Sequence, residues 1–292
     1  MLIGMIIKNK DLNNYENIKF REEAKKLKIN LELLNIEEFS VKIDQKIKIL
    51  YQGQELKNFD CLVNRLGSGC SRKYGNIIDT ISYNYRVINN GEIANLLKDK
   101  YKTLLKLQQN DIPIIPTMIS QKNYNLVEIK NNLELPIIKK SNVGTIGKGI
   151  YKVDNEQNLI DMLDFADLLD KKYFYILQEY IGHKPGEDIR IIMYKDKLIG
   201  AIKRKAKDDF KANYTIHQQG ESYEVSDKVL KLAQKIMKVL KCDIAGIDLL
   251  ETKDGFVVCE VNSAPGFVGM DNLNPGLNTA NKILYHIIND EN

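Results

Sequence analysis

The sequence predicts two structural classes in one chain, an α/β unit followed by α+β units. Residues 1 to about 95 alternate strand-like and helix-like stretches, which favours a small domain with a mainly parallel sheet. Beyond this point strands and helices mix without strict alternation, which favours α+β packing. The 292 residues, 43% of them hydrophobic, suffice for two or three cores. We expect domains at residues 1–95, 96–185 and 186–292.

The spacing of apolar residues predicts the elements of the first domain. Between Tyr15 and Lys28, apolar Phe20, Ala24 and Leu27 recur at helical spacing while Lys and Glu fill the other face. This pattern predicts an amphipathic helix. We expect strands at Leu2–Ile7, Leu31–Ile36 and Cys61–Asn64.

The later elements are predicted from the same periodicities. Glu92–Gln109 reads as one strong helix that ends at Asn110–Pro113, because a residue before proline avoids the helical conformation. Gly182–Gly186 interrupts both periodicities and is the best linker. We expect extended segments at Ile114–Ile119, Pro136–Lys140, Gly149–Val153 and Phe174–Ile181, two strands turning at Lys195–Lys197, and helices at Asn158–Leu169, at Ser226–Leu240 and within Leu277–Ile288.

Composition excludes several classes of protein. No apolar stretch approaches the roughly 20 residues that span a bilayer, and the first residues lack a leader pattern, so we expect a cytoplasmic protein with no membrane partner. A net charge of +4 is too small to imply a nucleic-acid partner. The four cysteines have no paired zinc-type spacing, which favours reduced, mostly buried thiols without metal or disulfide. The sequence leaves open whether the chain forms a homo-oligomer.

Three oxygen-bearing side chains fall on two apolar segments joined by the turn Thr252–Gly255. Alternation puts Glu260 and Asn262 on one face of their strand, and the hairpin places Asp248 roughly opposite Glu260. A buried acidic pair is costly unless a cation neutralises it, and this all-oxygen set suits Mg²⁺ or Mn²⁺ carrying nucleotide phosphates. The alternative is an ordinary hairpin with a solvated polar face.

A glycine-rich loop between two strand-like segments is a candidate phosphate site. Repeated glycines let backbone N–H groups approach phosphate oxygens, although a tight hairpin explains the loop equally well. It is neither a Walker loop nor a Rossmann fingerprint. Lys140 ends the preceding strand and Lys100 lies on the preceding helix. A lysine on a strand beside a glycine loop can reach phosphates as a point charge, which favours Lys140 over Lys100, and the alternative is that both are solvated surface charges. The candidate loop residues are Gly144, Thr145, Gly147, Lys148 and Gly149.

The strand end Gln178–Ile181 and the strands after the linker carry the remaining candidates. Backbone groups at such a strand end can pair with adenine, and the linker permits hinge closure. By alternation Arg204 points away from Lys203, Lys205 and Lys207, a row of cations that is either solvated or faces phosphate. The candidates are Gln178, Glu179, Tyr180, Ile181, Asp188, Arg190, Arg204 and Asn213, with His217 as a loop residue that either touches substrate or is simply exposed.

Taken in order, these motifs resemble the ATP-grasp fold with an N-terminal Rossmann-like (pre-ATP-grasp) domain, and most closely the RimK-type α-L-glutamate ligases. The motifs are Lys140, the glycine loop, Gln178–Ile181, Asp188–Arg190, Ala245–Asp248 and Glu260–Gly266. The resemblance implies that Asp248, Glu260 and Asn262 hold two Mg²⁺ or Mn²⁺ ions on ATP. It implies phosphate contacts from Lys100 and Lys140, and adenine contacts from the backbone of Glu179 and Ile181. It also implies that Asp188 lies near the ribose. Arg204 and Asn213 would lie over the reacting phosphates, and Arg190 is a further catalytic candidate.

The resemblance implies an ADP-forming carbon–nitrogen ligase that makes an amide bond through an acyl phosphate. The expected substrates are ATP, an amino acid such as L-glutamate, and a carboxylate- or amine-bearing acceptor, either a small-molecule cofactor or a peptide or protein tail. Pro265–Gly266 disfavours the relatives that depend on a carrier protein, which usually lack it. Two alternatives remain, an ATP-grasp kinase that phosphorylates a hydroxyl and a noncatalytic basic module that binds nucleic acid.

Overall fold

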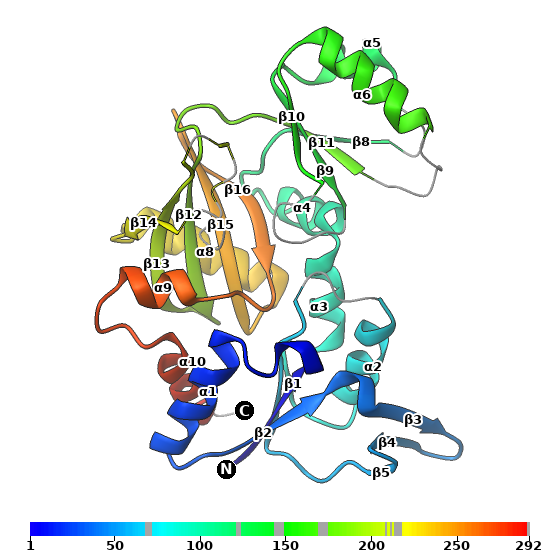
Figure 1. Cartoon of the computed structure of the whole chain (residues 1–292), viewed down its shortest axis with the longest axis vertical. Coiled ribbons are helices and arrows are strands. Elements are labelled where there is room, and N and C mark those ends of the chain that lie inside the picture. The colour runs from blue at the N-terminus through cyan, green and yellow to red at the C-terminus, as the bar shows by residue number, and fades with distance from the viewer. Residues whose placement is uncertain are drawn as a thin grey trace.

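The computed structural model describes residues 1–67, 72–120, 124–142, 149–168, 175–207, 209, 210, 212 and 218–290. Within these ranges the strands form four sheets, three of them large and one small (Figure 1). None of the helices in the described ranges has the length and apolar character needed to cross a membrane.

The first sheet is parallel, with the strand order β2-β1-β6-β7. Helix α1 (Tyr15–Lys26) follows β1 and buries Phe20 and Ala24, as its apolar spacing predicts. Helix α2 (Arg72–Ser82) was not predicted. The strands are β1 (Leu2–Ile7), β2 (Asn30–Asn35), β6 (Cys61–Asn64) and β7 (Val87–Ile88). The prediction of a small α/β unit with a parallel sheet is therefore confirmed.

A small antiparallel sheet projects from this first unit, at the lower right of Figure 1. It consists of β3 (Phe39–Ile43), β4 (Ile47–Tyr51) and β5 (Gln54–Glu55). Most of its residues are exposed or half-exposed. Phe39, Val41 and Ile43 alternate with Ser40 and Lys42, which is the pattern of a strand, so this part of the sheet was predictable but was overlooked.

The second large sheet is antiparallel, with the order β10-β9-β11-β8. It contains β8 (Thr117–Ile119), β9 (Ile137–Ser141), β10 (Tyr151–Val153) and β11 (Tyr175–Glu179). Helices α5 (Leu126–Asn132) and α6 (Glu156–Leu168) lie together on one side of it, at the top of Figure 1. Ile129 and Leu159 of these helices share a core with Leu177 of the sheet.

The third large sheet is antiparallel and has the order β14-β13-β12-β15-β16. Helix α8 (Asp227–Leu240) covers one face, where Val229 and Ile236 pack with Ile189 and Ile191. Alternation therefore directs Asp188 and its even-numbered neighbours to the opposite face. The strands are β12 (Glu187–Tyr194), β13 (Lys197–Lys205), β14 (Gln219–Ser222), β15 (Ile244–Thr252) and β16 (Gly255–Asn262).

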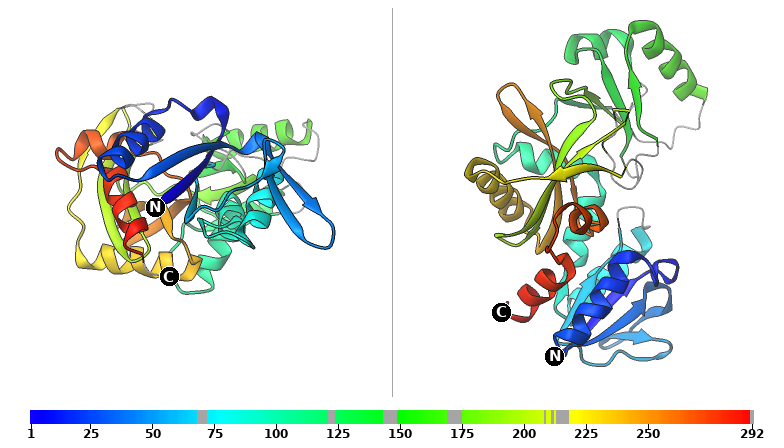
Figure 2. Two further views of the ribbon diagram at one scale, coloured as in Figure 1. Left: turned by 90° about the horizontal axis from the view of Figure 1, so that it is seen from below. Right: turned by 60° about the vertical axis from the view of Figure 1, so that its left-hand side comes forward.

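The opposite face of this sheet also packs against the N-terminal unit. Helices α9 (Val268–Leu273) and α10 (Thr279–Ile288) follow β16, and α10 packs on α1 (Figure 2). Phe267 is fully buried, and its ring meets Phe20 edge to face with centroids 5.5 Å apart. One core thus joins the first helix of the chain to the segment that follows the metal-candidate strand β16.

The prediction of one helix over Glu92–Gln109 is wrong. The chain forms α3 (Gly91–Lys98) and α4 (Lys100–Gln108), with an extended residue, Asp99, between them. The Asp99 carboxylate accepts hydrogen bonds from the Lys102 backbone and from the Asn142 side chain, both at 3.1 Å. This cap starts a new helix, because it satisfies N–H groups that a continuous helix would have paired internally. The break places Lys100 at the first turn of α4.

Candidate active site

A cavity of about 420 Å³ lies between the second and third sheets and reaches the N-terminal unit. Its volume is in the range of small-molecule sites. Twelve of the candidate residues from the sequence line it: Lys100, Lys140, Gln178, Glu179, Tyr180, Ile181, Asp188, Arg190, Arg204, Asp248, Glu260 and Asn262. Residues more than 150 positions apart in the sequence thus meet in one cavity.

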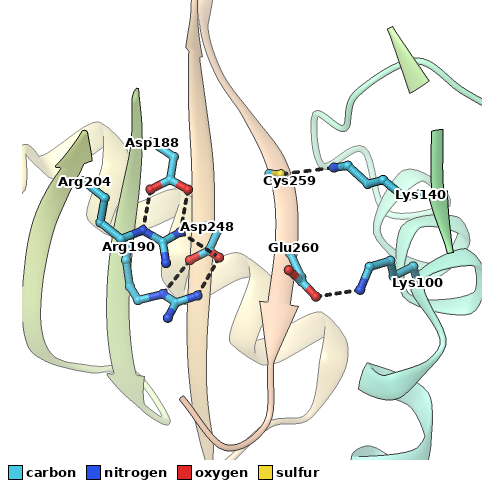
Figure 3. A network of polar contacts seen from close by, with 8 residues as sticks. All are labelled: Lys100, Lys140, Asp188, Arg190, Arg204, Asp248, Cys259 and Glu260. Carbon is cyan, nitrogen blue, oxygen red and sulfur yellow. Dashed lines mark hydrogen bonds and ion pairs between the residues drawn. The ribbon is translucent and has the colours of Figure 1, made fainter. Parts of the chain in front are cut away.

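Four charged side chains lie side by side across the third sheet (Figure 3). Asp188 is the register partner of Arg204, and Arg190 is the register partner of Asp248. Arg190 donates two hydrogen bonds to Asp248, at 2.8 and 2.7 Å. Arg204 donates to both oxygens of Asp188, with its Nε 2.6 Å from Oδ1, and its Nη2 also lies 3.0 Å from Asp248. Cross-strand register therefore builds two fork-shaped ion pairs on the face of the sheet opposite α8.

Burial and these ion pairs shift the pKa values of the two aspartates in opposite directions. Burial alone would raise the pKa of Asp248, but Arg190 and Arg204 outweigh it and lower the pKa to about 2. Burial dominates at Asp188 and raises its pKa to about 6, although Arg204 opposes the shift. The pKa of Arg204 is raised, because the charges of both aspartates outweigh its burial. Asp248 therefore keeps its negative charge at neutral pH.

Glu260 occupies the next strand, and its register partner is Asp248, as the hairpin predicted. Its carboxylate accepts a hydrogen bond from Lys100 at 2.7 Å, so the helix break at Asp99 brings Lys100 to the site. Asn262 lies two residues further along β16 and lines the same cavity. Asp248, Glu260 and Asn262 thus line one cavity, and their role is taken up below.

Cys259 is half-buried and lines the cavity. Asp248 pairs with Glu260 and Leu249 with Val258, so Cys259 is the extra residue of a β-bulge. Lys140 lies with its Nζ 3.5 Å from the Cys259 sulfur. Burial raises the pKa of this thiol, which therefore stays protonated. Cys61 and Cys242 are buried as predicted.

The strand end proposed for adenine lies at the edge of the cavity. The Tyr180 N–H donates to the Pro136 carbonyl at 2.9 Å. Among the described residues, the N–H of Ile181 has no hydrogen-bond partner. Gln178 is turned inward and donates to Thr117 at 2.8 Å, and its side-chain oxygen is buried without a partner among the described residues. The position leaves backbone groups available to a ligand at the end of β11.

The remaining candidates have other locations. Gly144, Thr145, Gly147, Lys148, Asn213 and His217 lie outside the described residues. Gly149 is described, with a left-handed φ of +74°, and its neighbour Ile150 lines the cavity. Lys203 and Lys205 do not line the cavity; alternation puts them on the face of β13 opposite Arg204, and each lies within 4.0 Å of Glu187.

Sequence reasoning missed one wall of the cavity. Glu16 of α1 and Gly67 come from the N-terminal unit, and their approach depends on how α1 packs on α10. Pro265 and Gly266 belong to the sequence motif Glu260–Gly266, but the sequence did not predict that they line the cavity. This wall comprises Glu16, Gly67, Ser263, Ala264, Pro265, Gly266, Val268, Gly269 and Met270.

Comparison with known proteins identifies the family. Residues 97–287 match the model of the RimK-like ATP-grasp domain, and residues 1–80 match that of the RimK PreATP-grasp domain. The chain belongs to the RimK-like ATP-grasp family. Members of this family use ATP with Mg²⁺ and form amide bonds, so the predicted ATP-grasp fold with its pre-ATP-grasp domain and the predicted ATP-dependent ligase class are confirmed.

Individual relatives agree with this assignment. A "Probable alpha-L-glutamate ligase" from Legionella pneumophila is 28% identical over 247 residues, which cover 82% of this chain and 80% of the relative. The crystal structure of a RimK domain ATP-grasp protein from Sphaerobacter thermophilus has a TM-score of 0.75 and 18% identity, covering 97% of this chain and 98% of that one. The ligase PsnB, solved with a minimal precursor, Mg and ADP, has a TM-score of 0.71 and 14% identity, covering 98% and 97%.

Proposed function

We propose that this RimK-like ligase joins an amino acid, L-glutamate or a close relative, to a small-molecule or peptide carboxylate acceptor. The observation that carries the proposal is the shared cavity, in which Asp248 and Glu260 adjoin Lys100, Lys140 and the two arginines. Facing carboxylates and cations suit a substrate that is polyanionic and carries divalent metal. The name of the Legionella relative supports glutamate as the amino acid.

The donor set fits magnesium. Asp248 and Glu260 are register partners on adjacent strands, and Asn262 shares the cavity, so three oxygen-bearing side chains face one space. Hard divalent cations bind oxygen ligands of this kind. We propose that the three residues hold two Mg²⁺ or Mn²⁺ ions on the phosphates of ATP. The bound ions would supply charge neutralisation at the transferring phosphoryl group.

The residues of the cavity divide into three tasks under this proposal. The backbone at Glu179 and Ile181 binds adenine, and Asp188 orients both the ribose and Arg204. Lys100 and Lys140 bind phosphate oxygens, and to do so Lys100 leaves Glu260. Gly144, Thr145, Gly147, Lys148, Gly149 and Asn213 are proposed to complete the phosphate contacts.

Arg190 and Arg204 stabilise the negative charge that develops during the two chemical steps. The acceptor carboxylate attacks the γ-phosphorus while the bond to ADP breaks, which gives an acyl phosphate. The amine then attacks the acyl carbon, the carbon–oxygen bond to phosphate breaks, and the amine loses a proton. Guanidinium groups positioned in advance are effective on such charges, and Arg190 and Arg204 leave Asp248 to act on them, as Lys100 leaves Glu260. Hinge closure at Gly182–Gly186 keeps water from the acyl phosphate under this proposal.

The test is Mg²⁺-dependent ADP release with a panel of carboxylates and amino acids, read together with product mass. We expect ADP only when a carboxylate and an amine are both present, and a product heavier by one amino-acid residue. Asp248→Asn and Glu260→Gln should each abolish turnover. Glu221→Gln is the matched control, since it removes a carboxylate of β14 that does not line the cavity. ADP release that needs no amine, with a phosphorylated hydroxyl product, would establish a kinase instead.

A further inference from the structure

The N-terminal unit contributes one wall of the cavity. The lining includes both the end of β11, at Gln178–Ile181, and Glu16 of α1, and Figure 1 shows β11 and α1 far apart on either side of the third sheet. At the α1 end its wall is formed mainly by backbone and apolar side chains, including Gly67, Gly266, Val268 and Met270. Glu16 is the charged residue that α1 contributes to this wall.

The carboxylate of Glu16 is held in a defined position. Its Oε1 accepts a hydrogen bond from the Phe267 backbone N–H at 3.0 Å, which ties α1 to the segment that follows β16. Gly266 lies directly beside it, because a Cβ on Gly266 would stand 3.1 Å from Oε1. Any other residue at position 266 would therefore crowd the carboxylate. Oε1 is anchored to the protein, and Oε2 has no hydrogen bond with the residues that the structure describes.

No cation of the described wall neutralises Glu16. It forms no ion pair within 4.0 Å in the ranges that the structure describes, whereas Lys100 pairs with Glu260 and Arg190 with Asp248. The buried guanidinium of Arg65 attracts the charge of Glu16 but forms no ion pair with it within 4.0 Å; it packs over the rings of Phe20 and Phe267 and donates to the Pro265 carbonyl at 3.0 Å. Arg65 does not line the cavity. A fixed carboxylate that has one oxygen without a hydrogen bond among the described residues, and no direct ion pair there, favours a cationic ligand.

We infer that Glu16 binds the ammonium group of the amine-bearing substrate, and so selects amino acids at the end of the cavity away from the nucleotide. The inference rests on the proposed ligase function and deepens it, because it assigns the amine side of the reaction to the N-terminal unit. The ammonium is recognised by a charge-assisted hydrogen bond to Oε2, and Val268 and Met270 offer apolar contact to the carbon chain beside it. Glu16 therefore contributes to binding of the amine-bearing substrate.

The deciding variant is Glu16→Gln. Glutamine keeps the oxygen that accepts from Phe267 N–H and removes only the charge, so a purely structural role of Glu16 predicts little change. The control variant is Glu22→Gln on the same helix, which removes an exposed carboxylate that pairs with Lys19 outside the cavity.

The experiment measures calorimetric binding to the full chain with Mg²⁺ and a nonhydrolysable ATP analogue present. The probes are matched pairs that differ by the ammonium group: L-glutamate with glutarate, L-aspartate with succinate, and L-alanine with propionate. We expect at least one amino acid to bind the wild type more tightly than its partner, by about tenfold or more. Glu16→Gln should remove that preference and leave glutarate, succinate and propionate binding unchanged, while Glu22→Gln should behave as wild type.

Two results would overturn the inference. One is that no amino acid binds the wild type more tightly than its deaminated partner. The other is that Glu16→Gln leaves the preference intact or weakens both members of a pair equally. Either result leaves the ligase function standing if ADP release still requires a carboxylate and an amine, so the two proposals fail separately.

Discussion

Removing one charge from Asp248 and one from Glu260 should have very different effects on stability. The two carboxylates are register partners in one cavity, and Asp248→Asn and Glu260→Gln each replace a carboxylate with its neutral isostere. Asp248 is 4% exposed and interacts with two guanidinium groups, whereas the Glu260 side chain is 31% exposed and, among the described residues, pairs with Lys100 alone.

The structure gives the size of each effect. Removing one partner of a buried ion pair costs about 3–5 kcal/mol, because the other charge is left uncompensated. At Asp248 the amide oxygen can still accept one hydrogen bond and Asp188 still neutralises Arg204, so we expect a loss of about 2–4 kcal/mol. At Glu260 the pair is partly exposed, and we expect a loss of about 1 kcal/mol or less.

The measurement is urea unfolding of the wild type and both variants without nucleotide or metal, at neutral pH. The expected order of stability is wild type, then Glu260→Gln close to it, then Asp248→Asn well below. Equal losses in the two variants, or a more stable Asp248→Asn, would refute the claim that Arg190 depends on Asp248 for compensation.

Three other predictions concern residues around the site. Asn89→Ala should lower the unfolding free energy, measured by urea unfolding, by about 2–4 kcal/mol. The buried Asn89 side chain makes hydrogen bonds with backbone groups of Asp243, Ile244 and Ser263, which would lose their partner. A change below about 0.5 kcal/mol would contradict this prediction. Lys140→Met should raise the KM for ATP about tenfold or more, because it removes a charge proposed to bind phosphate oxygens, while stability changes little. An unchanged KM would show that Lys140 does not contact the phosphates. Burial would raise the pKa of Asp290, but its hydrogen bonds to Lys195 and Tyr194 and the charge of Arg86 outweigh burial and lower it, so Asp290 stabilises the fold above the unfolded pKa of about 4 and this contribution is lost as pH falls through the folded pKa. The difference in unfolding free energy between wild type and Asp290→Asn should therefore be about 1–2 kcal/mol at neutral pH and shrink toward zero in acid. A difference that does not change with pH would contradict this prediction.

The parts of the site that were predictable from the sequence depend on local periodicity. The two-residue alternation of strands and the position of the turn at Thr252–Gly255 fix the pairing of Asp248 with Glu260, so the hairpin could be built without tertiary information. Arg204 was placed on a different face from Lys203 and Lys205 for the same reason.

The parts that were not predictable depend on contacts between distant segments. The break at Asp99 is stabilised by Asn142, which lies 43 residues further along the chain, and no local signal in Glu92–Gln109 outweighs its helical pattern. The place of Glu16 in the cavity depends on the packing of α1 on α10 and on a bond to Phe267, 251 residues away. Sheet β3-β4-β5 is a different case, because the alternation of Phe39, Val41 and Ile43 with polar residues was a local strand signal that was overlooked.

The central claim is that this RimK-like chain activates a carboxylate by phosphorylation before an amine attacks it. The most direct test gives the enzyme a substrate whose carboxylate oxygens carry the heavy isotope, together with its amine partner and Mg-ATP, and measures the label in the released phosphate by mass spectrometry. Transfer of one labelled oxygen to phosphate for each amide formed is the predicted result. Amide formation with unlabelled phosphate, or with AMP in place of ADP, would contradict the acyl-phosphate mechanism.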